Sequence, residues 1–372
     1  MSSASVVVIG GGIAGATTAF SLARRGADVA LVDDGGAGQA TAASAGIIAP
    51  WVSSVEGPFY DVYAAGGGFY PEYLSRLSGL GIPELGYRRS GALVVADDDA
   101  QLDRTADRVT ARVREAGDVA GEVRRLDAAS ARELFPALAE DLSGVLVTGG
   151  GRVDGRTLRD ASVTGARMRG ATTVTDAVVS VEQRAGGGWR VTTLRTHLDA
   201  DAVVVAAGAR IVDLLSRLGV RVGISPQRGQ IIHLALRGVN TSPWPTIHPL
   251  SDHYMTPFDG GRIAVGATRE TGSGFDARVT AGGQFDVLRK ALGVAPGLRD
   301  ATFLETRVGI RPMSDTGIPQ AGAVPGADGL WMVGGYGAAG LTMGPLLGDA
   351  IARSVLGEPA AELARTPVVV DA

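Results

Sequence analysis

The chain has 372 residues, with 35 Lys and Arg against 39 Asp and Glu, so its formal net charge at pH 7 is −4. This balance predicts no nucleic-acid partner, because polyanion binding needs a basic face. The chain has no cysteine, which excludes disulfides, thiolate metal sites and cysteine nucleophiles. At this length, two domains are expected.

The first third of the chain predicts a βαβ unit followed by further helices. The apolar run at 5–10 predicts a strand, 13–26 predicts a helix that ends in glycine, and "DVALVD" at 28–33 predicts a second strand. This order begins a doubly wound sheet. After a loop of small residues, helices are predicted over 59–79 and 98–117, separated by the strand "GALVVAD".

The rest of the chain contains segments with this alternation of strands and helices and one β-rich segment. A helix near 155–170 precedes two strands joined by a hairpin turn, and an apolar strand follows at 200–209. After Pro226 the pattern is β-rich, broken by a helix at 280–293, and the chain closes with a strand and a helix over 340–357. We therefore expect two interleaved domains: a nucleotide-binding domain of residues 1–80, 145–222 and 309–372, and a substrate-binding domain of residues 81–144 and 223–308.

An uncharged stretch at 329–348 is long enough to suggest a membrane span, yet five glycines and a proline interrupt it after its first strand-like residues. A lipid-facing helix is rarely so broken, so we expect a ligand-facing loop, a buried helix and no transmembrane segment. No basic segment precedes the first strand, and cysteine is absent. We therefore expect a cytoplasmic protein.

The first glycine-rich loop predicts a dinucleotide site. In "GGGIAG", Gly10, Gly12 and Gly15 have the G-x-G-x-x-G spacing between a strand and a helix, where the helix N-terminus attracts a pyrophosphate. Asp33 follows at the end of the second strand, where a carboxylate accepts hydrogen bonds from ribose hydroxyls and disfavours NADP. The motif alone leaves NAD and FAD open.

A second glycine-rich loop favours a flavin. "GYGAAGLTMGP", residues 335–345, opens a helix about three hundred residues after the first loop. A nicotinamide enzyme does not need this loop, because the first one already binds the pyrophosphate. A helix N-terminus directed at the flavin ring would stabilise the negative charge that develops there on reduction.

These blocks carry a resemblance. With "ATAASAGIIAP", "GYRRSGALVVADD" and "GIRPMSDTGIPQAG", they make the chain similar from end to end to the D-amino acid oxidase superfamily of flavoproteins. Within it, the chain looks most like glycine oxidase and the bacterial D-amino acid dehydrogenases. The resemblance implies an α/β, Rossmann-like FAD domain of the GR2 type, interleaved with an α+β substrate domain built on an antiparallel sheet. Without cysteine to tether it, the FAD should be noncovalent.

By position, the resemblance also implies the cofactor contacts. It places Ile13 and Ala14 at the pyrophosphate, and Asp33 and Asp34 at the adenosine ribose. It assigns the loop over the cofactor to Ala40 and Thr41, and the edge of the flavin to Ala45, Gly46 and Ile47. It assigns the contact with the adenine to Val178, and the contacts with the dinucleotide to Ala207 and Gly208. It assigns the isoalloxazine cradle to Tyr336, Gly337, Ala338, Ala339, Gly340, Leu341 and Thr342.

Arg311, in "GIRP", is the residue we expect to bind substrate. A guanidinium fork clamps a carboxylate with two parallel hydrogen bonds, and the arginine of this motif has that role in the family. The structural alternative is a salt bridge to Glu305 or Asp315. Tyr254 matches the position of an active-site tyrosine, with simple packing as its alternative. The four histidines lack metal-ligand spacing, so no metal is expected.

The implied reaction is oxidative deamination of glycine, an N-substituted glycine or a D-amino acid. Hydride passes from the α-carbon to flavin N5, water hydrolyses the imine, and O2 reoxidises the flavin. The alternatives are a quinone-linked D-amino acid or hydroxy-acid dehydrogenase and a non-enzymatic nucleotide-binding module; a homo-oligomer stays open. Glycine oxidase would place a histidine at Tyr336 and an arginine at Ala338, so we expect free glycine to be a poor substrate and a larger amine to be preferred.

Overall fold

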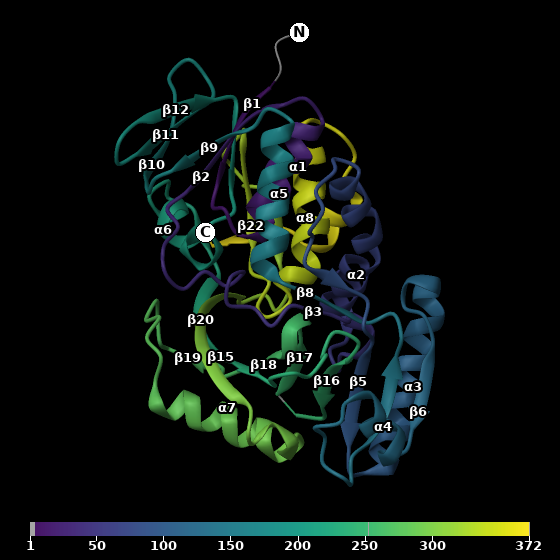
Figure 1. The fold of residues 1–372 in the computed structure, drawn as a ribbon. Helices are drawn as coiled ribbons and strands as arrows, with labels where there is room; N and C mark the ends of the chain where they lie inside the picture. The colour runs from purple at the N-terminus through teal and green to yellow at the C-terminus, as the bar shows by residue number, and fades with distance from the viewer. Residues whose placement is uncertain (1–3, 252, 372) are drawn as a thin grey trace.

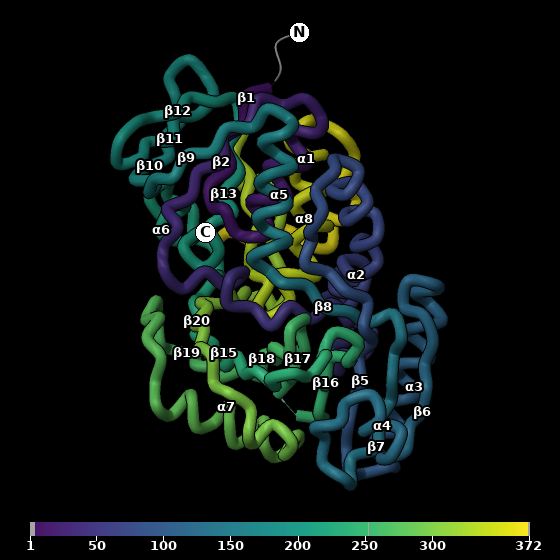
Figure 2. Tube along the Cα trace, viewed as in Figure 1, coloured from purple at the N-terminus to yellow at the C-terminus, as the bar shows by residue number. Residues whose placement is uncertain are grey.

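The computed structural model describes residues 4–251 and 253–371. Two sheets organise the chain, one in the upper and one in the lower half of the view in Figure 1. The upper half combines segments from the start, the middle and the end of the chain, as the purple, teal and yellow tubes of Figure 2 show. The fold class therefore agrees with the sequence-based expectation of a mixed α/β protein.

The upper sheet has six strands in the order β21-β22-β13-β1-β2-β9, and only β21 runs antiparallel to its neighbour. Its strands are β1 Ser5–Ile9, β2 Asp28–Asp33, β9 Thr172–Thr175, β13 Ala202–Val205, β21 Gln320–Ala323 and β22 Leu330–Gly334. Alternate residues of β1 enter two cores, because successive side chains of a strand point to opposite faces. Val6 and Val8 join one core, and Val7 and Ile9 join the other.

Helices and a second small sheet cover the two faces of this sheet. The helical core contains α1 Ile13–Arg24, α2 Gly57–Ser78, α5 Gly155–Met168 and α8 Gly340–Val355. The opposite face packs on β10 Val178–Gln183, β11 Trp189–Thr193, β12 His197–Ala200 and α6 Ile211–Ser216. The carboxyl ends of β1, β2 and β13 lie at one edge of the sheet, because these three strands run parallel.

The lower sheet has nine strands in the order β19-β15-β18-β17-β16-β5-β7-β6, with β20 paired to β15. All pairs are antiparallel except β16 with β5. Its strands are β5 Ala92–Ala96, β6 Val123–Leu126, β7 Ser143–Val147, β15 Ile224–Ala235, β16 Thr246–Pro249, β17 Tyr254–Pro257, β18 Arg262–Gly266, β19 Glu270–Thr271 and β20 Thr302–Ser314. Helices α3 Asp99–Ala116, α4 Ala128–Leu134 and α7 Ala281–Val294 pack on it.

Short strands complete the fold. A three-stranded sheet joins β3 Ile47–Ile48, β8 Gly151–Val153 and β4 Tyr87–Arg88. A two-stranded sheet joins β14 Arg221–Val222 to β23 Val370–Asp371. The sequence does not predict β20 as a strand, because its first half shows no clear alternation of apolar and polar residues, and only Gly309, Ile310 and Pro312 are buried. It crosses the domain boundary that we propose at residue 309.

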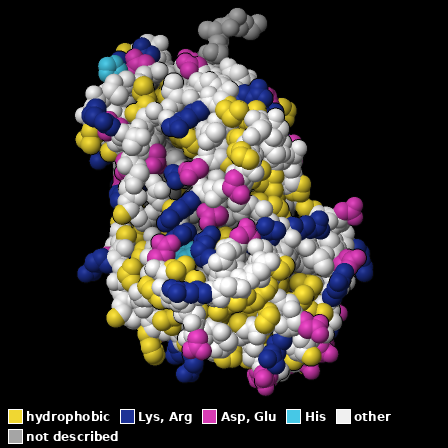
Figure 3. All heavy atoms as spheres, in the orientation of Figure 1, with side chains coloured by type: hydrophobic (Ala, Val, Ile, Leu, Met, Phe, Trp, Pro, Cys, Tyr) yellow, Lys and Arg dark blue, Asp and Glu magenta, His cyan; other side chains and the backbone are white. Residues whose placement is uncertain are grey.

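No helix in the described part of the chain is long and apolar enough to cross a membrane. On the face seen in Figure 3, basic and acidic side chains are interspersed. Such a face lacks the single-sign field that binds a polyanion.

Candidate functional site

A cavity of about 1010 Å³ lies between the two sheets. Ordinary ligand pockets enclose about 300–1,000 Å³, so this one has room for a large ligand. Among the predicted site residues, those that line it are Gly10, Gly12, Ile13, Ala14, Asp33, Asp34, Ala40, Thr41, Ala45, Gly46, Ile47, Val178, Ala207, Gly208, Tyr254, Arg311, Tyr336, Gly337, Ala338, Ala339, Gly340 and Leu341. Gly15 and Thr342 are not on its wall.

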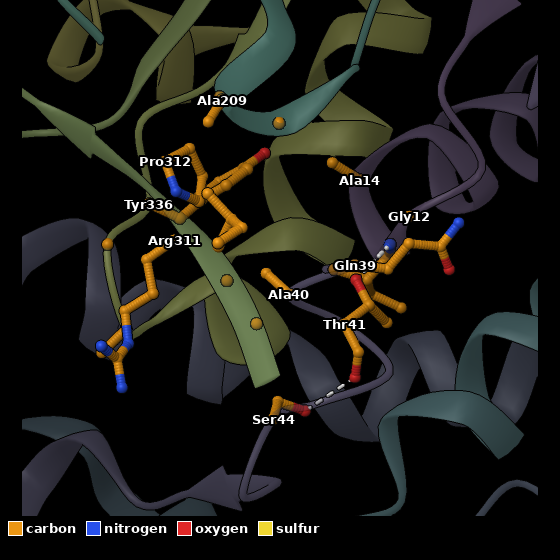
Figure 4. A pocket seen from close by; sticks show the side chains of 18 of the residues that line it. Gly12, Ala14, Gln39, Ala40, Thr41, Ser44, Ala209, Arg311, Pro312 and Tyr336 are labelled. Carbon is orange, nitrogen blue, oxygen red and sulfur yellow. Dashed lines mark hydrogen bonds between the residues drawn. The ribbon is translucent and has the colours of Figure 1, made fainter. Parts of the chain in front are cut away.

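The cavity has two chemically different ends. Gly12, Gln39 and Thr41 lie on one side of the view in Figure 4, and Arg311 lies on the other. We call the part formed by residues 10–14, 33–41, 178 and 207–208 the glycine-loop end. The part formed by Arg311, Tyr254, His248 and Arg269 is the arginine end.

At the glycine-loop end, the backbone sets the geometry. Gly10 N donates to Val32 O at 2.8 Å, which ties the turn after β1 to β2. A Cβ on Gly15 would lie 1.8 Å from the carbonyl oxygen of Gly10. Only glycine therefore allows α1 to begin this close to the turn, which is the packing role of the third glycine in this motif.

Asp33 holds the loop and faces the cavity. Its Oδ2 accepts a hydrogen bond from Gly11 N at 2.5 Å, and its Oδ1 accepts from Gly35 N at 2.8 Å and from Gln39 Nε2 at 3.2 Å. A carboxylate has about four lone-pair sites, so one remains for a hydroxyl of a bound ligand. The neighbouring Asp34 is exposed.

The loop after β2 closes over the start of α1. Gly12, the N-cap, has no side-chain cap, and Ile13 N donates to Thr41 Oγ1 at 3.0 Å. Ser44 Oγ donates to Thr41 O at 2.9 Å, a contact drawn in Figure 4. These bonds keep the loop along the cavity wall, so that its small side chains leave the space open.

The start of α8 forms the far wall of the cavity. The helix N-cap, Ala339, has no side-chain cap, so the positive end of the helix dipole is directed there. Tyr336 is buried, its Oη has no hydrogen-bond partner among the described residues, and burial raises its pKa. A buried unsatisfied hydroxyl is costly, which indicates that a ligand atom supplies the partner. Thr342 lies behind the wall, where its Oγ1 donates to Ile47 O at 3.2 Å.

Strand β20 holds Arg311 between the two loops. Ile310 N donates to Gly38 O at 2.8 Å, and Gly337 N donates to Pro312 O at 2.8 Å. The residues on either side of Arg311 are therefore bonded to the loop after β2, through Gly38, and to the second glycine-rich loop, through Gly337. This arrangement brings a guanidinium to the cavity that both loops line.

The guanidinium of Arg311 bonds to neutral groups. Its Nη1 donates to Thr268 O at 3.0 Å and to Gln227 Oε1 at 3.2 Å. The predicted structural alternative does not occur: among the described residues no carboxylate forms an ion pair with Arg311, and Glu305 instead pairs with Arg307 at 2.6 Å. The positive charge of Arg311 is thus left for a ligand.

Gly229 and Thr268 help to fix the position of the Arg311 guanidinium. A Cβ on Gly229 would lie 2.4 Å from Arg311 Nη2, so the absence of a side chain on β15 makes the space that the guanidinium occupies. Thr268, whose carbonyl accepts from Arg311, donates through Oγ1 to Glu270 Oε1 at 2.6 Å. Glu270 in turn pairs with Arg228 at 2.6 Å, so an ion-pair network supports the acceptor of Arg311.

Tyr254 and His248 complete the arginine end. Burial raises the pKa of Tyr254, and the nearby charges of Arg311 and Arg269 oppose this shift. Burial also lowers the pKa of His248 to about 4, so its imidazole is neutral at pH 7, and it shares a 2.9 Å hydrogen bond with Thr246 Oγ1. Tyr254 is thus a neutral hydrogen-bonding group beside Arg311.

Sequence reasoning assigned no role to Arg269 or Gly229. Both lie in stretches with only a weak resemblance to the family, and Gly229 is one of many glycines. The signal for both is structural, because β15 and the segment after β18 meet only through the antiparallel pairing of the lower sheet. No group of three His, Cys, Asp or Glu with the geometry of a metal site occurs among residues 4–251 and 253–371.

These residues fit FAD. The glycine turn and the start of α1 suit a pyrophosphate, Asp33 retains an acceptor for a ribose hydroxyl, and the uncapped start of α8 suits the flavin ring. The unpartnered Tyr336 hydroxyl gives a polar contact within the same cavity.

Comparisons with known proteins agree with this geometry. The family model of FAD dependent oxidoreductases, DAO, matches residues 5–354. The uncharacterized oxidoreductase YurR of Bacillus subtilis (strain 168) is 42% identical over 357 residues, which cover 95% of each chain. The crystal structure of iminodiacetate oxidase (IdaA) from Chelativorans sp. BNC1 is 45% identical with a TM-score of 0.93, over 97% of this chain and 98% of that one. Glycine oxidase from Geobacillus kaustophilus is 27% identical with a TM-score of 0.86, over 99% of both chains.

Proposed function

The chain belongs to the DAO family of FAD-dependent oxidoreductases, and from this premise we propose that it oxidises an amine that carries a carboxylate. The observation that carries the proposal is Arg311, a cation on the cavity wall with no carboxylate partner among the described residues. Glycine and iminodiacetate, named for two similar proteins, are both amines with a carboxylate. Their chemistry suits this arginine.

In this proposal, Arg311 orients the substrate. Its guanidinium accommodates a carboxylate through two parallel hydrogen bonds, and Tyr254 donates a further one from a phenol that stays protonated at neutral pH. The substrate α-carbon is thereby fixed with respect to both glycine-rich loops. Precise positioning of this kind lowers the barrier to reaction by removing orientational freedom.

Bound FAD supplies the oxidant, so that the amine loses a hydride from its α-carbon and becomes an imine that water hydrolyses. The protein side chains at the arginine end bind and orient, and none is needed as a strong base if the amine binds neutral. The imidazole of His248 is neutral at pH 7, so it adds no positive charge that would oppose the loss of a hydride from the substrate.

We propose O2 as the electron acceptor, since the similar solved structures at 45% and 27% identity are both named oxidases. The test is a comparison of O2 consumption and hydrogen peroxide formation with the purified protein and an N-substituted glycine. We expect equal amounts of the two. Substrate oxidation that proceeds only with a quinone would assign the protein to the dehydrogenase alternative.

The cofactor has its own test. Because the chain contains no cysteine, we expect FAD to copurify and to be released by acid or heat. Absorbance of the supernatant after acid precipitation measures the released flavin. Flavin that stays on the precipitated polypeptide would contradict noncovalent binding.

We also propose that the substrate is larger than glycine. Ala338 lines the cavity and is exposed, so no long side chain at this position fills the space. An extra apolar group buried there contributes about 0.8 kcal/mol per CH₂. A comparison of kcat/KM for glycine, sarcosine, D-alanine and D-leucine tests this size preference, and glycine as the best substrate would contradict it.

A further inference from the structure

A second arginine lies on the wall of the same cavity. Arg269 follows Thr268, the residue whose carbonyl oxygen accepts the hydrogen bond from Arg311 Nη1 at 3.0 Å. Arg311 lies on β20 and Arg269 directly precedes β19, and these two strands pair with β15 from its two sides, so the arginines reach the arginine end from either side of β15. Arg269 is exposed, as expected for a side chain at the mouth of the cavity.

The carboxylates beside Arg269 are engaged elsewhere. Glu270, the next residue, accepts hydrogen bonds from Arg228, Gln230 and Thr268. Asp276 pairs with Arg228 at 2.8 Å and with Arg278 at 2.9 Å. Among the described residues, no hydrogen bond or ion pair reaches the guanidinium of Arg269.

Acidic residues on the cavity wall do not neutralise it either. They are Asp33, Asp34, Glu56, Asp176 and Asp213. Asp33 and Asp34 belong to the glycine-loop end, and Asp176 pairs with Arg195 at 3.3 Å. Asp213 lies 4.0 Å from Arg210, and the charge of Glu56 raises the pKa of Arg112, against the lowering caused by burial. The arginine end thus has two cations that no acidic residue in the described part of the chain pairs with.

Tyr254 shows that both cations act on one place. The charges of Arg311 and Arg269 both favour the ionised form of its phenol and so oppose the rise in its pKa that burial causes. A ligand beside Tyr254 would therefore experience two positive charges. A ligand with one carboxylate would neutralise only one of these two charges.

We propose that Arg269 binds a second carboxylate, so that the preferred substrate is a dicarboxylic amine held by Arg311 at one end and by Arg269 at the other. This inference rests on the proposed function and refines its substrate class. A guanidinium–carboxylate pair at a partly exposed position gives a modest gain, and charge-assisted hydrogen bonds raise it. We therefore expect about a tenfold preference, which corresponds to about 1.4 kcal/mol.

The kinetic test compares iminodiacetate with its mono-amide, which has the same shape and lacks the second charge. The ratio of their kcat/KM values is measured for the native protein, Arg269→Gln, Arg269→Lys and the control Arg278→Gln. Arg278 is an exposed arginine of the same segment that does not line the cavity. We expect Arg269→Gln to lower the ratio about tenfold, Arg269→Lys to restore most of it, and Arg278→Gln to leave it unchanged.

A binding test separates this inference from the proposed function. Glutarate has the same chain length as iminodiacetate but no amine to oxidise, and butyrate lacks one carboxylate. Calorimetric titration of the FAD-loaded protein should show tighter binding of glutarate than of butyrate, with the difference lost in Arg269→Gln. An unchanged difference in that variant would overturn the role of Arg269, even if amine oxidation is confirmed. If glutarate binds as expected and no amine is oxidised, the proposed function fails and the dicarboxylate site stands.

Discussion

The two ends of the cavity use different parts of the chain for recognition. At the glycine-loop end, the contacts come from backbone groups and small residues: a turn through Gly10, an uncapped helix start and one carboxylate, Asp33. At the arginine end, they come from long or aromatic side chains on separate segments of the lower sheet, chiefly Arg311 and Tyr254. A large and constant ligand suits the first arrangement, whereas a small and variable ligand suits the second.

This difference has a consequence for mutations. A substitution at the glycine-loop end alters the main chain around the cofactor and so affects cofactor binding, and it affects folding as well where the backbone must shift. A substitution at the arginine end removes a side chain from a sheet that is otherwise supported, and so affects the substrate alone. Substitutions at the two ends should therefore have separable effects on flavin content and on substrate turnover.

The largest effect is expected for Gly15→Ala. Its Cβ would lie 1.8 Å from the carbonyl oxygen of Gly10, a backbone atom that cannot rotate away. Overpacking costs about 1–3 kcal/mol and more when the backbone must shift, so we expect little folded, FAD-bearing protein. Gly12→Ala is the matched control, because the nearest atom to its Cβ is Thr41 Oγ1 at 3.4 Å.

For Gly12→Ala we expect a folded protein with reduced flavin content, since the added methyl group faces the cavity. Thermal unfolding and the ratio of flavin to protein absorbance measure the two properties. Normal flavin content in Gly15→Ala would contradict the description of the glycine-loop end.

Arg311→Ala should show the next largest effect. Loss of one partner of a buried charged pair costs about 2–5 kcal/mol, which we expect to appear in kcat/KM for the carboxylated amine. Flavin content should stay near normal. Arg311→Lys keeps the charge and loses the planar fork, so it should recover only part of the activity. Unchanged kcat/KM in Arg311→Ala would remove this residue from the substrate site.

The same contrast explains what could be predicted from the sequence. The G-x-G-x-x-G loop, Asp33 and the loop before α8 are local patterns in which neighbouring residues share one turn, so the sequence displays them directly. Arg311 was reached because it lies in a recognisable motif. Arg269 and Gly229 could not be, because their relation to Arg311 depends on the pairing of β15 with β18, β19 and β20, which is not local in the chain.

The sheet beneath the arginine end should also make stability depend on pH. Burial, together with the charges of Arg307 and Arg262, lowers the pKa of His233 to about 3 from its ordinary value of 6.5. As pH falls, the unfolded chain therefore binds a proton on His233 before the folded chain does. The contribution of neutral His233 to stability is complete above pH 6.5 and declines as pH falls toward 3. With about 1.4 kcal/mol per pKa unit, the loss by pH 5 is about 2 kcal/mol.

Urea unfolding at pH 7.5 and pH 5, with saturating FAD, measures this loss. In His233→Asn we expect the difference between the two pH values to shrink by about the same 2 kcal/mol. A difference that is equal in both proteins would show that His233 does not control it.

Gly229→Ala should give the smallest effect. Its Cβ would contact the guanidinium of Arg311, which is the mobile end of a side chain, so the fold should tolerate the change while Arg311 is displaced. We expect kcat/KM to fall about tenfold, or about 1.4 kcal/mol, with flavin content unchanged. In an Arg311→Ala background the same substitution should cost nothing more, because the two residues act through one contact. Additive losses would contradict this coupling.

The most direct test of the account is anaerobic bleaching of the bound flavin. The purified yellow protein is mixed with glycine, sarcosine, D-alanine, D-leucine, an N-alkylglycine and iminodiacetate in the absence of O2, and the rate of loss of flavin absorbance is measured. We expect carboxylated amines larger than glycine to bleach the flavin, iminodiacetate to bleach it fastest, and Arg311→Ala to slow the bleaching by all of them. A flavin that no carboxylated amine bleaches, or one that bleaches in Arg311→Ala as fast as in the native protein, would contradict the account.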